Sequence, residues 1–221
     1  GQNSKWGTFP SVAAAWRISN ESFMKNMTSV SDLKLRVGYG ETGNANIGQY
    51  NSLQQYIFNN YVLNGNRVVG VSPGNFPNAD LQWEATKAFN IGLDLGLFKN
   101  RITFTADYYD KKTSQLLFFR TIPSTTGFAT ALVNLDGNNI QNKGFEFALN
   151  TINISTENVK WSTNFNFSRN MNKVLSIGNI PFQLTGNVSS SLYPGGNTAG
   201  ILKAGSPIGS FYGYVFDGIW Q

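Results

Sequence analysis

The 221-residue chain contains no cysteine and no histidine. It therefore cannot build a disulfide, a thiol or imidazole nucleophile, or the commonest kinds of zinc site. It also has no run of about 18 consecutive apolar residues, so the sequence predicts no transmembrane helix. The first residues, GQNS, lack the charged and apolar regions of a signal peptide. An exported protein would have lost its signal, or the sequence is an internal piece of a longer one.

Charged residues are also scarce, at 13% of the chain compared with roughly 25% in an average globular domain. The net charge is +5, but the 17 lysines and arginines are scattered, and no run is longer than Lys111-Lys112. A nucleic-acid-binding surface needs clustered basic residues. We therefore expect no nucleic-acid partner.

Apolar residues are plentiful, at 41% hydrophobic and 14% aromatic, and they follow a period of two. The clearest example is 88–110, where the odd positions from Phe89 to Leu97 are apolar and the even positions are small or polar. The pattern predicts a β-hairpin with arms of about ten residues. Average strands have about 5–6 residues, whereas a tilted strand that crosses a bilayer needs about 9–11.

Further strands are expected where the same alternation recurs, at 11–19, 33–40, 144–152 and 159–170, and in part over 208–221. The polar face of the hairpin carries Gly92, Asp94 and Gly96, which suits the crowded, hydrated interior of a membrane barrel. A soluble antiparallel sheet with one buried face also produces this alternation. The pattern by itself leaves barrel and sandwich open.

The connections between the predicted strands alternate in length. Shorter connections span 20–32, 98–101 and 153–158, and long ones span 43–86, 111–143 and 171–207. Outer-membrane barrels have short periplasmic turns and long extracellular loops. This alternation favours an all-β, antiparallel, up-and-down transmembrane barrel segment of about six long strands plus loop strands, with the short turns inside and the long loops outside.

Several sequence motifs resemble the C-terminal barrel of SusC/RagA-type TonB-dependent outer-membrane transporters. They are 77–86 (PNADLQWEAT), 90–94 (NIGLD), 98–101 (FKNR), 107–113 (DYYDKKT), 35–44 (LRVGYGETGN), 142–146 (NKGFE) and 209–214 (GSFYGY). Members of that family resemble barrels of about 22 strands closed by an N-terminal plug. Residues 1–221 would then be part of one β-barrel domain, with the plug domain and the remaining strands absent from this chain.

The resemblance implies TonB-dependent uptake of oligosaccharides or peptides across the outer membrane of a Gram-negative bacterium. It also implies two partners, a SusD-like surface lipoprotein over the outer mouth and the TonB system acting through the absent plug. We expect no cofactor in this segment. No metal is assigned, because the acidic, calcium-type loop of the family would follow Gln221.

A transporter of this kind needs no catalytic group, and we assign none. Six charged residues fall on the predicted polar faces and are candidates for the lumen: Arg17, Arg36, Asp94, Asp107, Glu146 and Lys160. Ionised groups stay hydrated there. They would line a solute path or pair with the plug and neighbouring strands, and both roles stay open.

Aromatic residues of the long connections are candidates for contact with a ligand or a lipoprotein lid: Tyr56, Phe58, Tyr61, Trp83, Phe118, Phe119 and Phe128. The same side chains would alternatively order the loops against one another. Trp83 has a third possibility, the membrane interface, where amphipathic rings prefer to lie.

Two alternatives to an importer stay open. One is a secreted, carbohydrate-binding β-sandwich module, and the other is a barrel wall without TonB-dependent import, such as a porin or a receptor for a secretion machine. A glycosidase would need two facing carboxylates, and nothing in the sequence brings a second acid toward Asp94 or Asp107 across a cleft. We therefore do not expect an enzyme.

Overall fold

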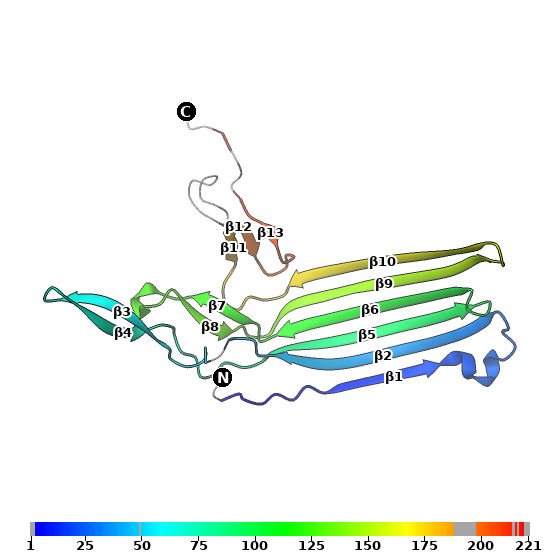
Figure 1. The fold of residues 1–221 in the computed structure, drawn as a ribbon, viewed down its shortest axis with the longest axis horizontal. Helices are drawn as coiled ribbons and strands as arrows, with labels where there is room; N and C mark the ends of the chain where they lie inside the picture. The colour runs from blue at the N-terminus through cyan, green and yellow to red at the C-terminus, as the bar shows by residue number, and fades with distance from the viewer. Residues whose placement is uncertain (1–2, 49, 188–197, 214, 216, 219–221) are drawn as a thin grey trace.

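The computed structural model describes residues 3–48, 50–187, 198–213, 215 and 217–218. Its largest element is a six-stranded antiparallel sheet in the order β1–β2–β5–β6–β9–β10 (Figure 1). The strands are β1 (Ser11–Arg17), β2 (Val30–Asn44), β5 (Glu84–Leu97), β6 (Ile102–Ser114), β9 (Asn138–Ser155) and β10 (Lys160–Val174). Chain order and spatial order agree across this sheet, which is the up-and-down arrangement predicted from the sequence.

Several of these strands are longer than the sequence alternation indicated. The strand expected at 33–40 runs from Val30 to Asn44, and β9 has 18 residues. A strand of this length exceeds the span of a bilayer, which takes about 9–11 tilted residues. The additional residues extend the sheet mainly toward the long loops, where polar side chains such as Glu41 and Lys87 replace the apolar ones.

Short and long connections lie at opposite ends of the sheet, as predicted (Figure 1). At one end β1 and β2 are joined through two 3-10 turns, η1 (Ile18–Asn20) and η2 (Ser22–Met24), while β5–β6 and β9–β10 are joined by tight turns. At the other end three longer segments each carry small sheets of their own. These are β3 (Tyr56–Leu63) with β4 (Asn66–Pro73), β7 (Leu117–Thr121) with β8 (Thr130–Asn134), and β11 (Gln183–Asn187) with β12 (Thr198–Leu202) and β13 (Ser210–Phe211).

The turn between β5 and β6 is built from left-handed backbone. Phe98, Lys99 and Asn100 have φ values of 53°, 59° and 60°, a region that side chains other than glycine and asparagine rarely adopt. Hydrogen bonds to the β1–β2 connection hold it: Phe98 N donates to the Ser29 carbonyl at 2.8 Å, and Asn100 N donates to Ser31 Oγ at 3.2 Å. The short-turn end is therefore fixed by contacts between neighbouring connections.

The two faces of the six-stranded sheet differ in character, and within the described residues no second layer covers the apolar one. On that face Phe104, Phe147 and Phe167 stack across β6, β9 and β10 with ring centroids 6.0–6.4 Å apart. Phe104 and Phe147 are half-buried, while Phe167 and its neighbour Phe165 on β10 are exposed, at 46% and 57%. A soluble sheet would bury them, so this face needs an apolar environment outside the chain.

The buried core lies instead among the long connections. Leu135, Val174 and Ile177 form its centre, and Phe118 packs against them. Asn139 is fully buried beside this cluster. The long connections are thus a folded cap on one end of the sheet.

No helix among the described residues is long and apolar enough to span a membrane. Part of the strand expected over 208–221, at 214, 216 and 219–221, lies outside the described residues. So does 188–197 within the third long connection.

Candidate functional site: a polar sheet face beneath a cap of loops

Three of the six charged candidates meet on the polar face of the sheet. Arg36 of β2 holds Asp94 of β5 through two parallel hydrogen bonds, Nε to Oδ2 at 2.9 Å and Nη2 to Oδ1 at 3.0 Å. Its Nη2 also lies 3.0 Å from Oδ1 of Asp107 on β6. The two-pronged geometry matches the fork of a guanidinium to a carboxylate. One cation thus bridges two carboxylates across three strands, and the three side chains together keep one negative charge.

Gly92 makes this arrangement possible. It lies between Arg36 and Asp107 in the register, directly opposite both. A Cβ at this position would collide with Asp107 Oδ1 and lie 2.6 Å from Arg36 Nη2. Glycine inside a strand often marks such a close approach. Because Gly92 has no side chain, the Arg36 side chain can extend across β5 to reach Asp107.

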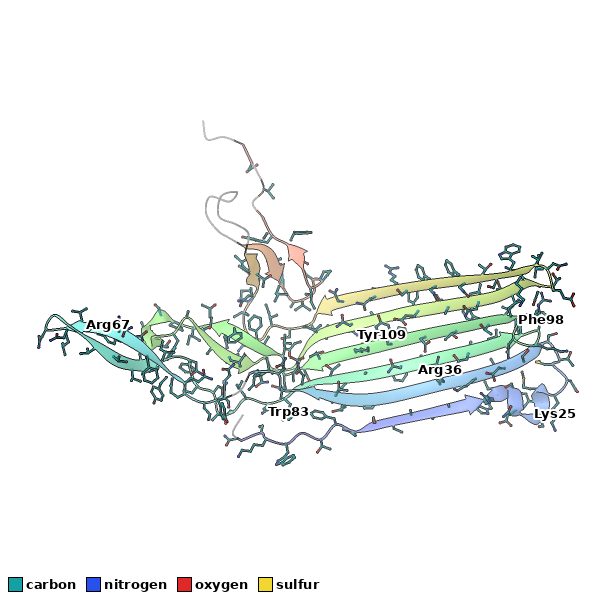
Figure 2. The ribbon with its side chains drawn as sticks, viewed as in Figure 1. Lys25, Arg36, Arg67, Trp83, Phe98 and Tyr109 are labelled. Atoms are coloured by element: carbon teal, nitrogen blue, oxygen red, sulfur yellow. The ribbon has the colours of Figure 1, made fainter. Side chains whose placement is uncertain are left out.

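A second long side chain crosses a glycine one strand further along, at residues that the sequence analysis did not name as candidates. Tyr109 of β6 crosses Gly144 of β9, and its hydroxyl donates to Asn170 Oδ1 on β10 at 3.1 Å. A Cβ at Gly144 would lie 2.7 Å from the Tyr109 hydroxyl. The sequence carried part of this signal, since Gly144 is the first residue of the strand expected at 144–152 and Tyr109 falls on a predicted polar face. Arg36 and Tyr109 both lie over the middle of the sheet in Figure 2.

The other three charged candidates are not brought into this cluster. Arg17 pairs with Asp32, Nε to Oδ1 at 3.3 Å, near the short-turn end. Glu146 lies opposite Asp107 in the register but is exposed and forms no ion pair within the described residues. Lys160 begins β10 at the short-turn end and is also exposed.

Glu146 faces an open depression of about 580 Å³ on the polar face. Arg36, Asp107, Tyr109 and Asn170 also line it. Hydroxyl, amide, carboxylate and guanidinium groups thus share one hydrated surface. Such a surface can hydrogen-bond a polar solute or the polar side of another domain.

The aromatic candidates of the long connections divide into packed and exposed residues. Trp83, which lies where the sheet meets the loops (Figure 2), donates from Nε1 to the Ser4 carbonyl at 3.1 Å and contacts Phe9 at 5.7 Å between ring centroids. This contact is loop packing. Phe118 packs on the buried cluster.

Phe128 packs edge-on against Phe76, with ring centroids 5.9 Å apart. With the exposed Phe119 these two rings border a cavity of about 480 Å³ between the β3–β4 and β7–β8 regions. The side-chain amides around this cavity mostly form hydrogen bonds with other loop residues. Asn75, for example, donates to the carbonyl oxygens of Asn51 and Leu53 and accepts from the backbone of Gln55.

Tyr56 and Tyr61 lie on the β3–β4 hairpin, which extends away from the sheet and carries Arg67 (Figure 2). The Tyr61 ring covers Gly70 on the facing strand. Tyr56 is on the other face of the hairpin, in a row with Phe58 and Val62 that is exposed to 63–77%. This apolar row has no partner in the described part of the chain.

The family model described as "TonB dependent receptor-like, beta-barrel" matches residues 1–210. The chain belongs to this family. TonB-dependent receptor P3 of Formosa agariphila is 37% identical over 220 residues, which cover 100% of this chain and 22% of that protein. TonB-dependent receptor SusC of Bacteroides thetaiotaomicron is 36% identical over 231 residues, 98% of this chain and 22% of its own length.

Solved structures agree with this family assignment. The structure of the RagAB peptide transporter superposes with a TM-score of 0.80 at 29% identity, covering 96% of this chain and 22% of that one. The RagAB peptide importer in its "open-open" state gives a TM-score of 0.77. The chain thus spans about a fifth of the length of these relatives. The resemblance to SusC/RagA-type proteins seen in the motifs is confirmed, and membership of a β-barrel family removes the sandwich alternative.

Proposed function

We propose that residues 1–221 form part of the wall of an outer-membrane transporter that imports oligosaccharides or peptides with energy from the TonB system. The observation that carries the proposal is the single-layer sheet, which leaves an apolar face exposed and places a charged, hydrogen-bonded network on the other. Lipid suits the first face, and an aqueous lumen suits the second. The names of the relatives support nutrient import.

Within this proposal the six-stranded sheet belongs to a single barrel domain. Its outer strands, β1 and β10, each pair on one side only within the described residues. Further strands of the full-length protein would continue the sheet at both edges, because an unpaired strand edge within a membrane is costly. A plug domain would then occupy the lumen, and Arg17, Glu146 and Lys160 would face it or the solute.

The apolar row on the β3–β4 hairpin supports a protein partner at the outer mouth. Phe58 and Val62 are exposed to 75% and 77%, and Val69 and Val71 of the facing strand lie on the same side. Contiguous exposed apolar surface marks interaction sites. A SusD-like lipoprotein that covers the barrel would bury this row. The family's role as receptors and transporters also favours a protein without enzymatic activity.

The face assignment is tested with single cysteines in the full-length protein, using a version without other cysteines. Leu93→Cys and Thr105→Cys lie on neighbouring strands but on opposite faces. After labelling with a fluorophore and reconstitution, we expect a lipid-attached quencher to quench the label at position 93 and to leave the one at 105 bright. The reverse pattern, or equal quenching at both positions, would contradict the proposed wall.

Import is tested separately by uptake of labelled oligosaccharides and peptides into cells. We expect uptake of one class to require the full-length protein, the TonB system and a co-purifying lipoprotein. Uptake that persists without TonB would instead support the porin-like alternative.

A further inference from the structure

The apolar face of the sheet ends in a group of cations toward the long loops. Lys112 of β6, Lys143 of β9, and Arg169 and Lys173 of β10 all lie on this face, and we call them the cationic belt. The register places them on the same strands as the stacked phenylalanines. Arg169 lies in the row of Tyr108 and Phe145, and the three lysines lie beyond that row toward the long loops. All four side chains are exposed.

The chain itself neutralises the belt only in part. The carboxylates on this part of the face are Glu41, which pairs with Lys87, and Asp110, which lies directly opposite Lys143 and sets one negative charge against four positive ones. Glu41 lies 3.4 Å from Lys87 Nζ and accepts from the Tyr39 hydroxyl, and Asp110 accepts from the Gln141 amide at 2.9 and 3.0 Å.

No member of the belt forms an ion pair with any residue that the structure describes. Lys112 is in addition directly opposite Lys87. Like charges placed opposite each other across two strands destabilise a sheet. The belt therefore keeps positive charge that an anion from outside the chain can balance.

The position of the belt, next to apolar rings on the same face, favours one kind of anion. Neighbouring strands are about 4.8 Å apart, so Lys112, Lys143 and Lys173 lie within about 10 Å of one another across β6, β9 and β10. Apolar rings begin directly beside them on the same face. A molecule with hydrocarbon chains against the rings and phosphate groups against the cations would satisfy both halves of this surface.

We propose that the cationic belt binds the phosphate groups of lipids in the leaflet around the long-loop end of the sheet. The inference rests on the proposed wall, in which the apolar face meets lipid. It adds a specific lipid contact to that wall, because the excess of positive charge in the belt favours phosphorylated lipids over neutral ones. Basic side chains near a membrane surface are attracted to anionic lipid in this way, and salt weakens the attraction.

The test measures lipid binding by the full-length protein purified in detergent. The probes are diphosphorylated lipid A and its dephosphorylated form, and the readout is bound lipid by native mass spectrometry. Lys112→Gln with Lys173→Gln should lower affinity for the diphosphorylated probe about tenfold, and the substitution of all four belt residues by Gln should lower it further. Affinity for the dephosphorylated probe should not change.

The matched control is Lys34→Gln with Lys111→Gln, which removes the same charge from the polar face. This variant should bind both probes like the wild type. Heat-dependent gel mobility verifies that every variant forms a folded barrel. The inference is wrong if the belt variants bind the diphosphorylated lipid as tightly as the wild type does. It is also wrong if an acidic peptide with the same net charge as the lipid probe displaces the bound lipid. A third outcome separates the two proposals. If lipid quenches the label at position 93 but the belt variants bind the diphosphorylated probe like the wild type, the proposed wall is supported and only the lipid-binding proposal is contradicted.

Discussion

At the scale of single residues, glycines on the polar face decide which long side chains can meet. Gly92 and Gly144 each lie beneath a side chain that crosses from one neighbouring strand to the other. The resulting contacts tie β2 to β6 and β6 to β10, over and above the backbone ladder between adjacent strands. Glycine is usually unfavourable inside a strand because it packs no side chain. Here the loss is offset by an ion pair and a hydrogen bond between strands that are not neighbours.

The substitution Gly92→Ala tests this view of the polar face. The added methyl group would push the Arg36 guanidinium away from Asp107, and loss of a partly exposed ion pair of this kind costs about 0.2–1 kcal/mol. We expect the free energy of unfolding of the full-length protein in urea to fall by that amount. Gly38→Ala is the matched control, since a Cβ there would meet only Ala13 Cβ at 4.0 Å. Equal stability of the two variants would contradict the proposed role of Gly92.

At the scale of elements, Asn139 links the second and third long connections, at 115–137 and after β10. Its Oδ1 accepts from Leu116 N at 2.9 Å, and its Nδ2 donates to the carbonyl oxygens of Asp136 at 3.1 Å and Ser176 at 3.4 Å. These partners belong to the segments that lead into β7 and out of β8 and β10. A buried amide with its groups satisfied can fix the relative positions of such segments.

Asn139→Leu should loosen this cap while the sheet stays intact. The substitution keeps the approximate size of the side chain but leaves Leu116 N and two carbonyls without partners, at a cost of about 1–3 kcal/mol for a buried group. We expect hydrogen exchange to rise on the order of tenfold at Leu116 and Ser176 and to remain unchanged in β5 and β6. Asn164→Leu is the control, because Asn164 is exposed and makes no side-chain hydrogen bond within the described residues. Unchanged exchange at Leu116 would show that Asn139 does not hold the cap.

At the scale of the whole molecule, the two ends of the sheet are built differently. One end has tight turns that are held to each other, and the other carries hairpins, a buried cluster and exposed aromatic side chains (Figure 1). Barrels of the outer membrane place their long loops outside the cell. The β3–β4 hairpin would therefore project from the cell surface, and the β9–β10 turn would lie in the periplasm.

Epitope tags in the full-length protein test this orientation. A tag inserted at Asn64-Gly65 of the β3–β4 hairpin should bind antibody on intact cells. A tag inserted at Glu157 of the β9–β10 turn should bind only after the outer membrane is permeabilised. The opposite result would reverse the orientation of the sheet.

The sequence predicted the strands of the large sheet well because five of the six have 13–18 residues, and all keep a period of two over most of their length. It did not predict the β3–β4 hairpin, although Asn64-Gly65, with φ values of 52° and 75°, is a common two-residue hairpin turn. The role of Asn139 had no such local signal. It depends on contacts with residues 23 and 37 positions away, which only the fold brings together.

The hairpin inside the first long connection also affects how the large sheet assembles. β2 and β5 pair with each other across the connection 45–83, and a chain of that length must lose entropy to bring its ends together. Residues 56–73 pair among themselves from Tyr56 to Pro73, so they remove close to half of the connection from the loop that remains to be closed. Each halving of a flexible loop saves about 0.6 kcal/mol of closure entropy. The β3–β4 hairpin thus lowers the entropic cost of pairing β2 with β5, the longest-range strand pairing in the sheet. If the hairpin forms early, the wall would insert faster.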